Sequence, residues 1–234
     1  MLGTSEMTGS PQDLGSAVSE QLSDDERAFV YRWLAGVFAR ELSVEALAAY
    51  RTEEGVALLQ HLEGQPALAG LARQLAMRTA GEGALGPVAG ELAGAFARLF
   101  LSAGGRRSAP PYESAYTSER GLLFQDATDH MAKRLTELAL TLPRDFPEPP
   151  DHIAVQLSVM AELASRGAER GADQAQEELI RMQQSFAETR LIPWAPRFRD
   201  DCVAYDRSGF YTAAADSLVA FVMHDVACLQ TRGN

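Results

Sequence analysis

The chain has 234 residues, of which 46% are hydrophobic, and a formal net charge of −11 at pH 7. A chain of this length and composition can bury roughly 70–75% of its unfolded surface, which favours one compact domain. The acidic balance and the absence of a stripe rich in Lys and Arg argue against a nucleic-acid partner.

The negative charge is concentrated at the N-terminus. Residues 1–26 contain six acids and neither Lys nor Arg, which leaves about −5 for the rest of the chain. Residues 1–22 are rich in Gly, Ser, Thr and Gln and hold few large apolar groups. This composition predicts a mobile acidic tail over residues 1–22, followed by one helical domain over residues 23–234.

Cysteine usage and hydropathy predict the compartment. Cys202 and Cys228 are 26 positions apart and form no CxxC motif, which fits a reducing environment. No basic region followed by an apolar run opens the sequence, and the apolar stretch over residues 92–101 is interrupted by Arg98. We therefore expect a cytoplasmic protein without stable membrane insertion.

From Ser23 onward the chain shows helical periodicity. Ser23 and Glu26 have the spacing of a capping box, which predicts a helix from there to about Glu41. Apolar residues recur every three or four positions over residues 68–75, 92–100, 131–142, 153–164, 179–186 and 211–226. No segment alternates β-branched residues, so the sequence predicts an all-α fold of about ten helices. Breaks are expected at residues 81–87, 102–118, 143–150 and 193–196.

Several patterns suggest chemistry but lack its context. Residues 81–86 match GxGxxG, yet a helical pattern rather than a strand precedes them, so a linker is the better interpretation. No two histidines are four residues apart, which removes the usual helical metal pair. The sequence therefore predicts neither a metal nor another cofactor.

The segment Glu148-Pro149-Pro150-Asp151-His152 is the most unusual in the chain. Two consecutive prolines forbid a helix upstream, so the acid and the imidazole fall where a new helix begins and free N–H groups collect. A carboxylate there is stabilised by the helix dipole, which is a sufficient structural explanation. The alternative is that the rigid corner presents Asp151 and His152 as a functional pair.

The long break over residues 102–118 contains a second candidate. Tyr112 and Tyr116 are four positions apart around Glu113, so a short helical turn would gather two rings beside a carboxylate. Such a group suits a cationic, partly apolar peptide. The structural alternative is that both tyrosines pin the loop to the core.

Three segments together resemble a known family. Residues 96–100, residues 110–116 (Pro-Pro-Tyr-Glu-Ser-Ala-Tyr) and residues 148–152, followed by residues 157–163, are similar in order and spacing to the TorD/DmsD/NarJ-type chaperones. The likeness extends to Pro193-Trp194 and to Phe210-Tyr211, and it covers roughly residues 25–230.

The resemblance implies an all-helical cytosolic binding protein without catalysis. Members of this family hold the twin-arginine signal peptide or an N-terminal segment of a molybdopterin-dependent oxidoreductase, assist cofactor insertion and hold back premature export. Some form homodimers by exchanging helices at the proline hinge, so both monomer and swapped dimer are compatible with the family. The residues carried over to the peptide site are Tyr112, Glu113, Tyr116, Glu148, Asp151 and His152, with Pro149 and Pro150 as the structural hinge. We expect Asp151 to be the central recognition residue.

Two other functions remain open from the residues alone. One is a metal-assisted or acid–base enzyme that uses Asp151 and His152 with Glu113, which requires the three groups to converge on one pocket. The other is a helical scaffold without a dedicated ligand, in which the corner only caps a helix.

Overall fold

A computed structural model describes residues 21–101, 105–118, 123–141, 146, 148–168 and 174–232. Within these ranges the chain forms eleven α-helices and one π-helical turn, and it contains no strand. The all-α prediction is confirmed. Almost all of the predicted tail over residues 1–22 lies outside the described residues, as do Pro143 and Pro147 of the predicted hinge.

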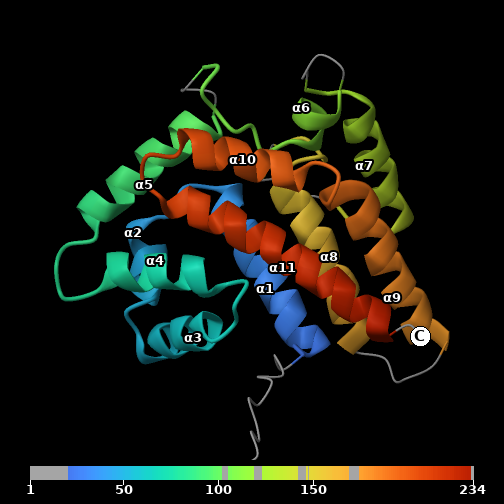
Figure 1. Ribbon diagram of the computed structural model, residues 1–234, viewed down its shortest axis with the longest axis horizontal. Helices are drawn as coiled ribbons and strands as arrows, with labels where there is room; N and C mark the ends of the chain where they lie inside the picture. The colour runs from blue at the N-terminus through green and yellow to red at the C-terminus, as the bar shows by residue number, and fades with distance from the viewer. Residues whose placement is uncertain are drawn as a thin grey trace, which may run out of the picture.

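Most of the helices follow one another with short connections, and longer ones precede α6 and α8 (Figure 1). The N-terminal half contains α1 (Asp24–Ala39), α2 (Val44–Ala49), α3 (Glu53–Glu63), α4 (Ala69–Thr79) and α5 (Gly86–Leu99). The C-terminal half contains α6 (Glu113–Thr117), α7 (Asp126–Glu137), α8 (Ile153–Ala168), α9 (Gln174–Phe186), the π-helical turn η1 (Ala187–Leu191), α10 (Ala195–Tyr205) and α11 (Phe210–Arg232). The described residues of the four predicted breaks lie between helices, apart from the short α6 and the first residues of α5 and α10.

The first helix begins where the sequence predicts. The Ser23 side chain accepts a hydrogen bond from the N–H of Glu26, and the Glu26 carboxylate accepts one from the N–H of Ser23 at 2.7 Å. This capping box satisfies two free N–H groups at the start of α1. Helix α1 forms its most extensive contact with α8, and this pair is central to the fold.

An aromatic cluster joins the ends of four helices. Phe38 of α1, Phe96 of α5, Phe198 of α10 and Tyr211 of α11 surround Phe100, with ring centroids 5.0–5.9 Å from it or from one another. Most of these pairs meet edge to face, the arrangement that aromatic quadrupoles favour.

Helix α11 is long and apolar enough, by length and composition, to cross a membrane. Half of its most apolar 18-residue window is nevertheless buried against the rest of the protein. The helix contacts α1, α4, α5, α9 and α10, and Figure 1 shows it running diagonally across the molecule. These contacts are those of a core helix, which passes the same test of length and composition.

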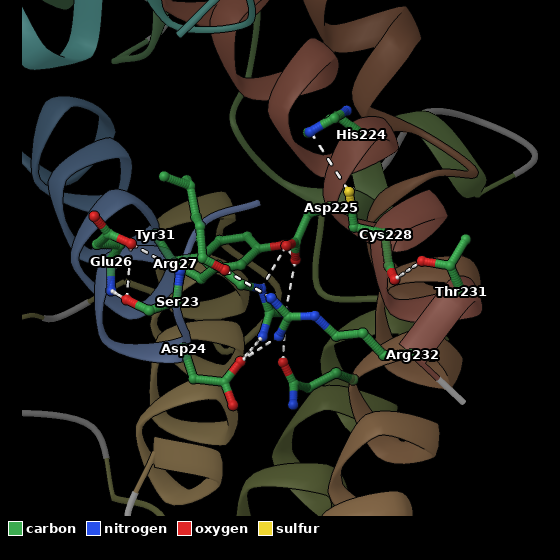
Figure 2. A network of polar contacts seen from close by, with 12 residues as sticks. Ser23, Asp24, Glu26, Arg27, Tyr31, His224, Asp225, Cys228, Thr231 and Arg232 are labelled. Carbon is green, nitrogen blue, oxygen red and sulfur yellow. Dashed lines mark hydrogen bonds and ion pairs between the residues drawn. The ribbon is translucent and has the colours of Figure 1, made fainter. Parts of the chain in front are cut away.

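A buried polar network ties α1, α9 and α11 together (Figure 2). The guanidinium of Arg27 donates to both carboxylate oxygens of Asp225, at 2.5 and 2.9 Å, and to the Gln183 side chain at 2.6 Å. Tyr31 donates its hydroxyl proton to Asp225 at 2.7 Å, and Asp24 accepts from Arg27 at 2.7 Å. Despite burial, these partners raise the pKa of Arg27 above its usual range, so the guanidinium stays charged.

We expect Asp225→Ala to lower the free energy of unfolding by about 3–5 kcal/mol, because it leaves the Arg27 guanidinium buried without its main counterion. Urea denaturation followed by circular dichroism measures the change. The matched control is Glu178→Ala, which removes an exposed partner of Arg181 and should cost less than about 1 kcal/mol. Equal losses in the two variants would contradict a central role for the buried network.

Candidate functional site

Two segments that are distant in sequence meet in an isolated antiparallel bridge between Tyr112 and His152. The N–H of Ile153 donates to the carbonyl of Pro111 at 2.8 Å, and the N–H of Glu113 donates to the carbonyl of Asp151 at 3.1 Å. The bridge joins the residues just before α6 to those just before α8. The two candidate segments of the sequence therefore lie together.

We call the place where residues 111–113 meet residues 151–153 the crossing. The Asp151 side chain is fully buried there. Its Oδ2 accepts a hydrogen bond from the N–H of Ser114 at 3.0 Å, and its Oδ1 accepts one from the hydroxyl of Thr128 at 2.9 Å. One carboxylate thus connects the starts of α6, α7 and α8. No part of Asp151 is exposed in this structure, so both carboxylate oxygens face protein partners.

His152 is also buried, and it caps the next helix. Its Nδ1 accepts a hydrogen bond from the N–H of Ala154 at 3.1 Å. The ring packs edge to face against Tyr112 and Phe146, with centroids 5.1 and 5.4 Å away. Burial lowers the pKa of His152 to about 4, so the imidazole is neutral at pH 7. The capping interpretation of the corner therefore describes His152 well.

Glu148 and Tyr112 form the half-buried edge of the crossing. The Tyr112 hydroxyl donates to Glu148 Oε2 at 2.6 Å. Burial and the adjacent Glu148 carboxylate raise the pKa of Tyr112 above its usual range, which keeps the phenol protonated as the donor. Pro149 and Pro150 stand between Glu148 and the buried Asp151, and both are half-buried. Among the residues predicted to contact a peptide, Tyr112 and Glu148 are the two that solvent reaches.

Glu113 faces the interior on another side. Its Oε2 accepts from the Gln156 side chain at 2.6 Å and its Oε1 pairs with Arg190 at 3.2 Å. The Trp194 indole N–H in turn donates to Gln156 at 3.2 Å. Burial raises the pKa of Glu113 to about 7, although Arg190 and Gln156 both oppose the shift. No sequence pattern indicates that Arg190 and Gln156 belong to this cluster, because their contact with Glu113 depends on the packing of η1 and α8 against α6.

Tyr116 points away from Tyr112 and into the core. Its ring stacks on Trp194 with centroids 5.5 Å apart, and the Arg197 guanidinium lies over it at 5.8 Å. Only 7% of Tyr116 is exposed. The short helical turn predicted around Glu113 is present as α6, but only Tyr112 stays half-exposed, so the two rings do not form one cradle.

An open groove of about 440 Å³ lies beside this corner. We call it the hinge groove. It is lined by Arg32, Ala35, Gly36, Ala39, Arg40, Leu135, Leu140, Thr141, Phe146, Ala154, Val155, Ser158, Val159 and Glu162. Small and apolar residues of α1 and α8 make up half of this lining, and Phe146 connects it to the ring of His152.

The arrangement favours binding over catalysis. Asp151, His152 and Glu113 are engaged with three different sets of partners instead of converging on one pocket. Within the described ranges, no group of three or more His, Cys, Asp or Glu side chains is placed to hold a metal ion. An apolar groove beside a polar corner is a surface on which an amphipathic helix can dock.

Comparison with known proteins identifies the family. Residues 62–200 match the family described as nitrate reductase delta subunit, and the chain belongs to this family. Among its relatives is the chaperone protein TorD of Photobacterium profundum, which is 33% identical over 211 residues that cover 88% of this chain and 95% of the relative. The TorD chaperones of Vibrio parahaemolyticus and of Vibrio cholerae El Tor are each 31% identical and cover 88% and 89% of the chain.

The family resemblance drawn from the sequence is therefore confirmed. Since the relatives are chaperones and the family is non-enzymatic, the prediction that the chain is not an enzyme is confirmed as well.

We expect Asp151→Ala to lower the free energy of unfolding by about 2–4 kcal/mol, because it leaves the Ser114 N–H and the Thr128 hydroxyl without their charged acceptor. Thr128→Val removes only one of these hydrogen bonds and should cost about 1–2 kcal/mol. Chemical denaturation of both variants measures the difference. An unchanged midpoint in Asp151→Ala would show that the carboxylate does not hold the crossing.

The raised pKa of Glu113 predicts a pH dependence of stability. Because the folded protein binds this proton more tightly than the unfolded chain, the contribution favours folding below a pH of about 4.5 and is lost as the pH rises through about 7. Relative to Glu113→Gln, the wild type should therefore become less stable between about pH 5 and pH 7 and change little above about pH 8. The comparison requires denaturation curves of both proteins across this range; parallel pH profiles would contradict it.

Proposed function

We propose that the protein is a cytoplasmic chaperone for a molybdopterin-dependent oxidoreductase. It binds the twin-arginine signal peptide or the N-terminal segment of this client, assists insertion of the cofactor and holds back premature export. The names of its relatives support the chaperone role, and the family resemblance supports the class of client. Monomer and helix-swapped dimer bury nearly the same contacts, so the proposal applies to either.

The observation that carries this proposal is the hinge groove beside the Glu148 and Tyr112 pair. A twin-arginine signal presents two guanidiniums next to an apolar run, so its receptor needs a carboxylate next to an apolar surface. Glu148 supplies a half-buried carboxylate at the corner, and Tyr112 holds it in place. The apolar residues of α1 and α8 supply the surface.

The length of the groove fits a short peptide segment. Ala154 and Glu162 both line it and are eight residues apart on α8, which corresponds to about 12 Å along the helix axis. Two turns of a bound helix, or about four extended residues, span this distance. Arg32 and Arg40 flank the groove, so the apolar run belongs there and the guanidiniums of the signal belong at Glu148.

The buried residues of the predicted site have a supporting role in this proposal. Asp151 holds the two segments in register, and His152 caps α8 and packs against Phe146 in the wall of the groove. Pro149 and Pro150 keep Glu148 at a set distance from the buried crossing, since proline restricts the backbone. Tyr116 and Glu113 act through the packing of α6.

Filling the groove tests the proposal without disturbing the core. Gly36 lies on the exposed side of α1, and a Cβ built there meets no atom within 4 Å. Gly36→Leu should weaken binding of a synthetic signal peptide about tenfold or more, from a dissociation constant in the micromolar range or below, while helix propensity leaves stability unchanged or higher. Isothermal titration calorimetry measures the affinity.

The matched control is Gly90→Leu, an equally open position in the middle of α5 and outside the groove. This variant should bind as the wild type does. Equal binding by Gly36→Leu and Gly90→Leu would reject the groove as the peptide site.

A second variant tests the charge. Glu148→Gln keeps the shape and removes the carboxylate, so it should weaken a peptide with two arginines about fivefold to tenfold and a peptide with two glutamines hardly at all. Glu177→Gln, an exposed carboxylate on α9, is the charge-matched control. If neither peptide binds the wild type, the protein is the helical scaffold without a dedicated ligand.

A further inference from the structure

A polar cleft of about 290 Å³ lies between α7 and the end of α9, and it shares no lining residue with the hinge groove. We call it the α7/α9 cleft. Its charged lining consists of Lys133, Arg134 and Glu137 from α7 and Arg190 from η1. In a chain with a net charge of −11, this cleft combines three cations with a single carboxylate.

The lone carboxylate is a weak competitor inside the cleft. Glu137 is 3.9 Å from Lys133 and 3.3 Å from Arg134, and the side chains of Lys133 and Glu137 are 78% and 47% exposed. Exposed ion pairs of this kind contribute little and exchange readily with solvent ions. A more highly charged anion can therefore displace Glu137 from both cations.

Arg190 is the best positioned of the three cations. Its side chain is only 24% exposed, and its Nη1 is already held by Glu113 at 3.2 Å. The π-helical turn that carries it is closed by a hydrogen bond from the N–H of Ile192 to the carbonyl of Ala187. A guanidinium has five N–H donors, so the contact with Glu113 leaves others for an oxyanion. Part of the entropy cost of ordering this side chain is already met in the free protein.

The neutral groups of the cleft also suit an oxyanion. The Ser185 hydroxyl and the His130 ring line the wall and are both exposed to solvent. Hydroxyl and imidazole N–H groups donate hydrogen bonds to phosphate oxygens as guanidinium and ammonium groups do.

We propose that the α7/α9 cleft binds a small polyanion through a phosphate or pyrophosphate group. The volume lies at the lower end of the range for ligand pockets, which accommodates such a group with a short organic substituent and is too small for a complete nucleoside triphosphate. The site is separate from the hinge groove and shares with the crossing only Arg190, the partner of Glu113. It goes beyond the proposed binding of a client peptide and does not depend on it.

The test is isothermal titration calorimetry of the full chain with inorganic pyrophosphate, inorganic phosphate and glycerol phosphate in a chloride buffer. Pyrophosphate should bind most tightly, because its charge is highest, and its affinity should fall as sodium chloride is added. Binding of glycerol phosphate as tightly as pyrophosphate would identify a phosphorylated organic molecule as the source of the group; tighter binding of pyrophosphate identifies a diphosphate.

Three variants test whether pyrophosphate binds in the α7/α9 cleft. The double variant Lys133→Gln/Arg134→Gln should weaken pyrophosphate binding about tenfold or more, since two charge-assisted contacts are lost. Glu137→Gln should tighten it severalfold, because the competing carboxylate is gone. Arg181→Gln, an exposed arginine of α9 that does not line the cleft, should leave the affinity within about twofold of the wild type.

Opposite effects of the α7 variants, with the Arg181 control unchanged, support the cleft. Circular dichroism confirms that each variant is folded, which is expected because Lys133 and Glu137 are exposed and Arg134 is partly exposed. No heat of binding with millimolar pyrophosphate would overturn the proposal. An equal loss in Arg181→Gln would also overturn it, because it would show a general charge effect. Binding of an aspartate-rich peptide, without binding of pyrophosphate, phosphate or glycerol phosphate, would overturn it as well.

Discussion

The buried carboxylate of Asp151 is the interaction on which the arrangement of the C-terminal half depends. It accepts hydrogen bonds from Ser114 and Thr128 while its own backbone carbonyl accepts from Glu113. Inside the protein, hydrogen bonds to a charged acceptor are strong and an unpaired charge is costly, so the three chain segments are held together or the carboxylate is left unsatisfied. The corner that holds Glu148 and His152 is consequently rigid.

A second buried charge stabilises the packing of α11 against α1 and α9. Arg27 and Asp225 join α1 to α11, and Gln183 of α9 completes the coordination of the guanidinium. The Asp151 cluster lies at the start of α8 and the Arg27 cluster lies on α1, and these two helices form the most extensive contact in the fold. Apolar helix faces alone allow several registers of similar packing, whereas a buried ion pair must meet its partner. Both clusters therefore select one helix arrangement, which is the role best established for buried polar groups.

The corner separates the residues that hold the structure from those that face solvent. Asp151 and His152, which hold the structure, are buried, whereas Tyr112 and Glu148 are half-buried. Tyr112 packs on His152, and His152 packs on Phe146 in the lining of the hinge groove. Because the supporting groups are already satisfied within the protein, binding need not order them, and less free energy is lost on association. Arg190 pairs with Glu113 and also lines the basic α7/α9 cleft, so it connects the neighbourhood of the crossing to a second polar surface.

The sequence by itself determined the all-α class, the start of α1 at the Ser23 and Glu26 capping box, the principal breaks and the family. These features depend on local spacing and on neighbours within one helical turn, which a single sequence displays. It also indicated that residues 110–116 and 148–152 belong to one site, through their resemblance to the family. Only the tertiary structure decided that Asp151 is buried between Ser114 and Thr128, that Tyr116 faces Trp194, and that Arg190 pairs with Glu113. Burial and partners of that kind arise from contacts between residues far apart in the chain, and the spacing of residues carries no record of them.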